Sequence, residues 1–240
     1  MIGDNPAARL LAVLEAGQQK NQNMSCREAW QQILGVEKGR DALLMSRLGK
    51  VMELPEQAIQ ILNRDFPNQT TTFHHWNAKV NHAFSQQNLN AEWKSFQGHI
   101  DTHTLSYLRL TADLVQTKMP TKLLAAETTG ELRSQVDRLL VEVLEGDFEN
   151  EIKEYVARYL RHLIIALDEY HISGALPVIE TVEGAFGHAF FDDKYREAIS
   201  GTPIGQEVVN VLSAVASAVT IALGAPQLPN AIQLMLEKFK

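Results

Sequence analysis

The sequence predicts an all-α protein, a multi-helix array or bundle in two halves that ends in an apolar helical hairpin. Apolar residues recur every three or four positions in almost every patterned segment, which is the period of an α-helix. No run of alternating apolar and polar residues is long enough to indicate a β-strand. The chain of 240 residues is 45% hydrophobic and 21% charged, a balance that is typical of globular domains and excludes general disorder.

The N-terminal half, residues 1–118, is expected to contain a series of short helices. Their apolar markers, in order, are Leu10 to Leu14, Leu43 to Val51, Ile59 with Leu62, Phe73 to Phe84, Trp93 with Phe96, and Leu105 to Leu114. Pro55 suits the first turn of the third of these helices, because proline is tolerated where a helix begins. Residues 17–32 and 63–90 are dense in Asn, Gln and Thr, which indicates loops and helix ends.

The C-terminal half, residues 131–240, begins after a predicted boundary at residues 119–130, which hold Pro120 and three Thr. Two helices follow, with apolar stripes from Leu132 to Leu144 and from Phe148 to Leu167. Gly146 and Asp147 lie between the stripes and predict the turn of an antiparallel hairpin.

The end of the chain has no charged side chain from Val208 to Leu236. A hairpin over residues 204–236 is predicted here, because Gly224 and Pro226 stop its first helix and a second apolar segment follows. Small neutral side chains form one stripe of the first helix and would allow a second helix to approach closely. The predicted packing surface consists of Ser213, Val215, Ser217, Val219 and Leu223.

Three environments fit this charge-free segment. It can be a buried hairpin of a soluble protein, a hairpin that inserts into a membrane or mediates self-assembly, or a spanning helix. A helix over residues 208–224 is about 25 Å long at about 1.5 Å per residue, shorter than the roughly 30 Å hydrocarbon core of a bilayer. The length therefore favours the buried hairpin over a spanning helix.

The formal net charge is −7, and the negative charge is concentrated in residues 121–240, while the first half is nearly neutral. The absence of a basic cluster argues against nucleic acid as a partner. Any membrane contact would depend on apolar insertion, since an acidic half is repelled by anionic headgroups. The single cysteine, Cys26, and an N-terminus without a secretory signal lead us to expect a bacterial cytoplasm, with or without membrane association.

No catalytic, metal or cofactor signature is clear in the sequence. His99 and His103 would share a helix face, as two zinc ligands can, but Asp101 or Thr102 can instead cap a helix that starts at His103. We therefore expect no metal site and no cofactor.

Arg158 and His162 lie one helical turn apart. They are similar to the Arg and His of the HEPN class of helical ribonucleases, which are spaced slightly further apart. An Arg can stabilise a phosphate while a His moves a proton, but a solvated helix face explains the pair as well.

Several segments resemble a set of bacterial all-helical proteins without a known function. They are Asn88 to Phe96, Asp101 to Leu105, Ala112 with Asp113, Ala166 to Gly174, and Gln227 to Pro229. The shared residues are packing and turn residues, so the resemblance implies a fold and assigns no catalytic residue. Where those sequences tend to have Arg after the Tyr, this chain has His171.

The expected function is that of a non-enzymatic interaction protein, an accessory or effector component of a bacterial anti-phage defence or toxin system. Its C-terminal hairpin would mediate assembly with a protein partner or with itself, or contact a membrane. Two alternatives stay open, a HEPN-like ribonuclease that uses Arg158 and His162, and a helical domain that binds a small apolar ligand.

Overall fold

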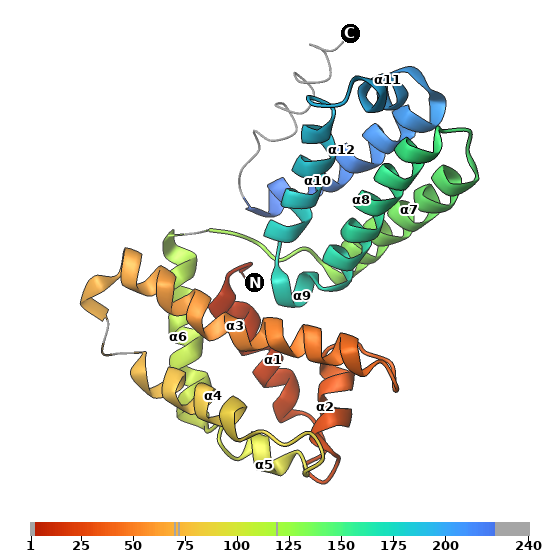
Figure 1. Ribbon diagram of the computed structural model, residues 1–240. Coiled ribbons are helices and arrows are strands. Elements are labelled where there is room, and N and C mark those ends of the chain that lie inside the picture. Colours follow the sequence, from red (N-terminus) through yellow and green to blue (C-terminus); the bar gives the residue numbers. More distant parts are fainter. Residues whose placement is uncertain (1–2, 70, 72, 119, 224–240) are drawn as a thin grey trace. The chain divides into compact units, whose positions relative to one another are not determined.

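The structure is a computed structural model that describes residues 3–69, 71, 73–118 and 120–223 (Figure 1). Within these ranges the regular structure is helical, with twelve α-helices and one short 3-10 helix. The predicted all-α class is confirmed. The chain divides into two compact units, Met1–Thr121 and Lys122–Lys240. The predicted halves, residues 1–118 and 131–240, stay a prediction.

The first unit is built around its N-terminal helix. Its elements are α1 (Pro6–Gln18), α2 (Cys26–Ile33), α3 (Asp41–Asp65), η1 (Pro67–Gln69), α4 (His74–Gln86), α5 (Lys94–Gln97) and α6 (Thr102–Lys118). Helix α1 packs against α2, α3 and α6 (Figure 1). It begins where the Asn5 side chain accepts a hydrogen bond from the Ala8 N–H, with Pro6 in the first turn.

The core of the first unit contains all three tryptophans of the chain. Trp30 packs edge-to-face against Trp93, with ring centroids 5.2 Å apart. The indole N–H of Trp93 donates to the Gly17 carbonyl at 2.8 Å, and that of Trp76 donates to the Thr111 hydroxyl at 3.1 Å. These bonds allow the polar edge of each indole to be buried without an unsatisfied donor.

Two predictions about the first half were wrong. Pro55 does not begin a helix but lies inside α3, which runs unbroken from Asp41 to Asp65. A proline in a helix interior costs about 3 kcal/mol; here the apolar face on both sides of Pro55 is buried, from Leu44 to Leu62, and its packing outweighs that cost. Helix α2 lies within a segment that was expected to form loops and helix ends, because buried Trp30 and Ala29 anchor it to the core.

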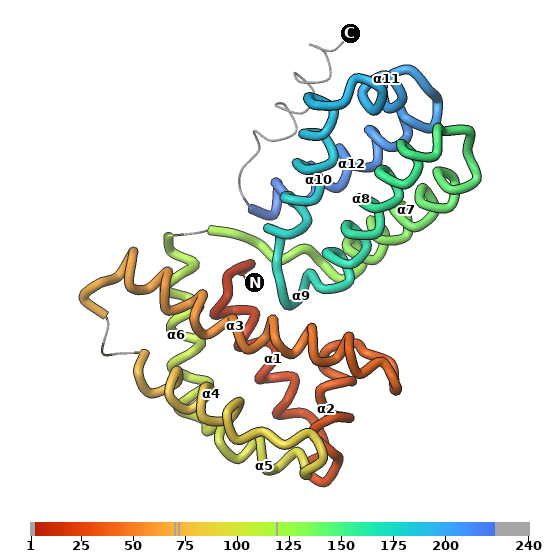
Figure 2. Tube along the Cα trace, viewed as in Figure 1, coloured from red at the N-terminus to blue at the C-terminus, as the bar shows by residue number. Residues whose placement is uncertain are grey.

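The second unit is a packed set of helices whose core comes mainly from α7, α8, α10 and α12. Its helices are α7 (Ala126–Glu145), α8 (Asn150–Asp168), α9 (Tyr170–Ser173), α10 (Leu176–His188), α11 (Asp193–Gly201) and α12 (Pro203–Leu223). The predicted α7 and α8 are confirmed as an antiparallel hairpin that turns at Gly146 (Figure 2). Arg133 near the start of α7 pairs with Asp168 at the end of α8, at 3.2 Å.

Helix α12 closes this core. Its buried side includes Val208, Leu212, Val215 and Val219. Thr220, predicted for the polar stripe, is also buried, because its hydroxyl donates to the Ala216 carbonyl at 2.8 Å and so needs no other partner. Residues 224–236, the second part of the predicted hairpin, lie outside the described residues, and the hairpin stays a prediction.

Candidate interaction surface

The side of α12 that faces away from the core carries only small or neutral side chains beyond Glu207. Six residues of this side are exposed or half-buried: Asn210, Ser213, Ala214, Ser217, Ala218 and Ile221. Ile221 is 73% exposed. An exposed helix side normally carries Lys, Glu or Arg, so a side without any charge is unusual. A contiguous apolar patch marks a contact site, whereas a single exposed apolar side chain is common. We call these six residues the α12 surface.

The structure separates the five residues that were predicted to form one packing surface. Val215 and Val219 have no exposed area and belong to the core of the second unit. Ser213, Ser217 and Leu223 are half-buried. A partner that approaches the folded unit can therefore touch the two serines and Leu223 but neither valine.

A groove lies between α12 and α7 and joins the α12 surface at Asn210 and Ala214. Its volume is about 380 Å³, and its lining residues are Gln135, Arg138, Leu139, Glu142, Glu207, Asn210, Val211 and Ala214. Leu139 and Val211 are buried, whereas the charged side chains around them are exposed. Among the described residues Arg138, Glu142 and Glu207 take part in no ion pair, so their charges are available to a partner.

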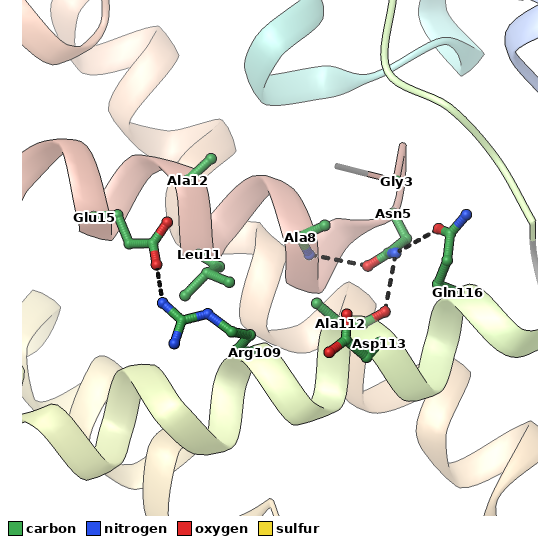
Figure 3. A pocket seen from close by; sticks show the side chains of 10 residues that line it. All are labelled: Gly3, Asn5, Ala8, Leu11, Ala12, Glu15, Arg109, Ala112, Asp113 and Gln116. Carbon is green, nitrogen blue, oxygen red and sulfur yellow. Dashed lines mark hydrogen bonds and ion pairs between the residues drawn. The ribbon is translucent and has the colours of Figure 1, made fainter. Parts of the chain in front are cut away.

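A second depression lies between α1 and α6 in the first unit (Figure 3). Its volume is about 210 Å³, and its polar groups bind one another. Arg109 pairs with Glu15, and the Asn5 amide donates to the Ala112 carbonyl at 3.3 Å and to the Gln116 side chain at 3.4 Å. These side chains thus hold α1 to α6, and the depression offers few groups that need a ligand.

His99 and His103 do not share a helix face. His99 lies in the turn before α6, and His103 lies in the first turn of that helix. Asp101 caps α6 by accepting hydrogen bonds from the Thr104 N–H at 2.7 Å and hydroxyl at 2.9 Å, as the capping alternative foresaw. The Thr104 N–H and, to a smaller extent, His75 lower the pKa of Asp101. The described residues contain no group of three His, Cys, Asp or Glu side chains arranged to hold a metal.

Arg158 and His162 are both exposed on α8 and line neither of the depressions described above. The Arg158 guanidinium lies over the Tyr155 ring, 4.0 Å from its centroid. Tyr155 stacks in turn on His188, with centroids 3.6 Å apart and planes 11° apart. Arg158 is therefore placed by packing against the aromatic ring, since guanidinium groups stack well on such rings.

The residues around this stack were not predicted from the sequence. His188 lies 3.3 Å from Asp192, whose pKa is lowered chiefly by a hydrogen bond from the Tyr195 N–H. Burial raises the pKa of Tyr195, whose ring packs edge-on against His188. These aromatic residues come from three helices, and only the regular stripe on α8 could have pointed to Tyr155.

By length and composition, α12 is the one helix of the described residues that could cross a membrane. Half of its most apolar window is buried inside the second unit, as in a core helix of a soluble protein. Comparison of the chain with protein-family models, curated proteins and solved structures gives no match. Function must therefore be argued from the surface itself.

Proposed function

We propose that the chain is a non-enzymatic helical interaction protein that self-associates through the α12 surface and the adjoining groove. One observation carries the proposal: the exposed side of a long helix has no charge from Val208 to Leu223 and presents Ile221 to solvent. Covering the apolar part of this surface with a second apolar or small-residue surface is favourable by about 25 cal/mol per Å² of apolar area.

The small side chains favour another helix as the covering element. Ala214, Ser217 and Ala218 lack long side chains, so a second helix can approach closely along them. A second copy of the chain supplies such a helix. In a two-fold contact the same patch covers itself, and each residue pair occurs twice.

The charges in the groove suit such a contact. The groove carries one cation, Arg138, and the carboxylates of Glu142 and Glu207, none of them in an ion pair within the described residues. Across a two-fold axis near the groove, Arg138 of one copy would meet a carboxylate of the other. Charge pairing of this kind orients an interface more than it strengthens it.

Light scattering coupled to size exclusion tests the proposal with matched substitutions. Ala214→Arg places a long charged side chain on the exposed α12 surface and is expected to convert the assembly to a monomer. Ala16→Arg makes the same change at an exposed helix position of the other unit and should leave the mass unchanged. A monomeric wild-type chain, or equal masses for both variants, would refute self-association through this surface.

Membrane contact is the second candidate, supported by the length and apolarity of α12. Because the second half of the chain is acidic, insertion is expected in neutral phosphatidylcholine vesicles and should not need anionic lipid. Flotation of the wild-type chain, lost in Ile221→Glu, would support this candidate. A wild-type chain that stays with the soluble fraction would refute it.

The two remaining expectations draw no support from the described residues. Arg158 packs on the Tyr155 ring, and His162 is exposed to solvent. A ribonuclease that used this pair would cleave RNA, and His162→Ala would abolish the cleavage. The groove of the second unit is lined mainly by charged and amide side chains, and such side chains make up half the lining of the depression in the first unit. Neither is the predominantly apolar pocket that a small apolar ligand prefers. The setting in a bacterial defence or toxin system stays a prediction.

A further inference from the structure

Two histidines of the first unit meet although they are distant in the sequence. His82 lies on α4, and His99 lies in the turn between α5 and α6. Their ring centroids are 4.8 Å apart, and the ring planes are 87° apart. The backbone fold brings them together, since Phe84 and Phe96 of the same two segments also pack against each other, with centroids 5.4 Å apart.

The nitrogens of both rings are available. His82 is exposed and His99 is half-buried, so solvent reaches the pair. Within the described parts of the chain, no hydrogen bond or ion pair engages either ring. Metal-binding imidazoles need one free nitrogen each, in the neutral form.

The spacing of the rings suits two ligands of one transition-metal ion. With a zinc–nitrogen bond of about 2.0–2.1 Å, an imidazole centroid lies roughly 3.2 Å from the ion. Two such rings have centroids roughly 5.2 Å apart at a tetrahedral angle and roughly 4.5 Å apart at a right angle. The observed 4.8 Å falls between these values, so the separation of the rings is compatible with two ligands of one ion.

We propose that His82 and His99 form a two-histidine site for a divalent transition-metal ion of the kind that imidazole prefers, Zn²⁺, Ni²⁺ or Cu²⁺. Water completes the coordination, because the described residues supply no third side-chain ligand at this place. A bound ion links α4 to the turn before α6 and so stabilises the first unit.

Two charged side chains close in sequence to the pair would have opposite effects on a bound cation, since a carboxylate attracts it and an ammonium group repels it. Asp101 follows His99 by two residues, and Lys79 precedes His82 by one helical turn. Lys79 lies 3.9 Å from Asp101, and His75 lies 3.6 Å from the same carboxylate. The carboxylate thus offsets the lysine, and the immediate surroundings carry little net charge.

Calorimetric titration of the full chain with ZnCl₂ tests the site. One ion is expected to bind to the wild-type chain with an affinity that His82→Ala and His99→Ala both abolish. His103→Ala is the matched control, an exposed histidine close in sequence to His99, and should bind as the wild type does. Circular dichroism of the metal-free variants verifies that they are folded, which we expect because neither ring is buried.

Thermal unfolding followed by tryptophan fluorescence gives the second readout, because all tryptophans belong to the first unit. Zinc at ten times its Kd should raise the unfolding midpoint of that unit by about 5 °C. The shift should vanish in His82→Ala and His99→Ala. Zinc binding that survives these substitutions in folded protein, or a wild-type chain that does not bind zinc, would overturn the proposal.

Discussion

Leu160→Ala should destabilise the second unit without affecting the first. Leu160 lies in the middle of α8, has no exposed area and belongs to a core cluster formed wholly by residues of the second unit. Truncating a buried leucine to alanine costs about 3 kcal/mol in lost burial and cavity formation. A unit of roughly 120 residues has an unfolding entropy of about 0.25 kcal/mol/K, so the midpoint should fall by about 12 °C.

Two spectroscopic probes separate the units. Fluorescence excited at tryptophan reports the first unit alone, whereas far-ultraviolet circular dichroism reports the helices of both. In Leu160→Ala the fluorescence transition should stay at its wild-type midpoint, while part of the dichroism transition moves to lower temperature. Equal shifts of both signals would show one cooperative structure and would refute the reasoning. Leu108→Ala, in the core of the first unit, is the reciprocal control and should move the fluorescence transition.

Further predictions concern two helix glycines and pH. Gly205→Ala should cost about 2–3 kcal/mol, because an added Cβ would lie 2.2 Å from the Ala198 carbonyl oxygen. Gly187→Ala should stabilise the protein by about 0.5 kcal/mol in urea denaturation, because no other group lies within 4 Å of the added Cβ. Folding lowers the pKa of Asp101 and of Asp192, so their contribution to stability is present above the unfolded pKa of about 3.9 and is lost as the pH falls through the folded values. Asp192→Asn should therefore reduce the drop in thermal midpoint below pH 4, and an unchanged pH profile would contradict this prediction.

The sequence predicted those helices in which an apolar side contrasts with a charged side. The stripe from Phe148 to Leu167 alternates with charged residues, so both the existence of α8 and its buried side could be inferred. Gly174 ends α9 in a backbone conformation with φ of +73° that glycine readily adopts.

The α12 surface could be located only in part, for a physical reason. Without charged residues, the sequence marks no solvent side, and Val, Ala, Ser and Thr fit a buried or an exposed position almost equally well. Val215 and Ser217 were therefore placed on one surface, although only Ser217 reaches solvent.

Contacts between distant segments were beyond sequence patterns. Helical spacing suggested only His103 as a neighbour for His99, whereas the fold places His82 of α4 beside His99. Pro55 was given a helix start because its local preference is strong, and the packing of α3 overrides that preference.

The rate at which an introduced thiol on the α12 surface reacts tests self-association most directly. Ala214→Cys places a thiol at an exposed position, and the natural Cys26 is buried. If a second copy covers this surface, alkylation of the introduced thiol slows as the protein concentration rises. Ser46→Cys, exposed on α3, should react at a constant rate. A rate for Ala214→Cys that is equally independent of concentration would contradict the account.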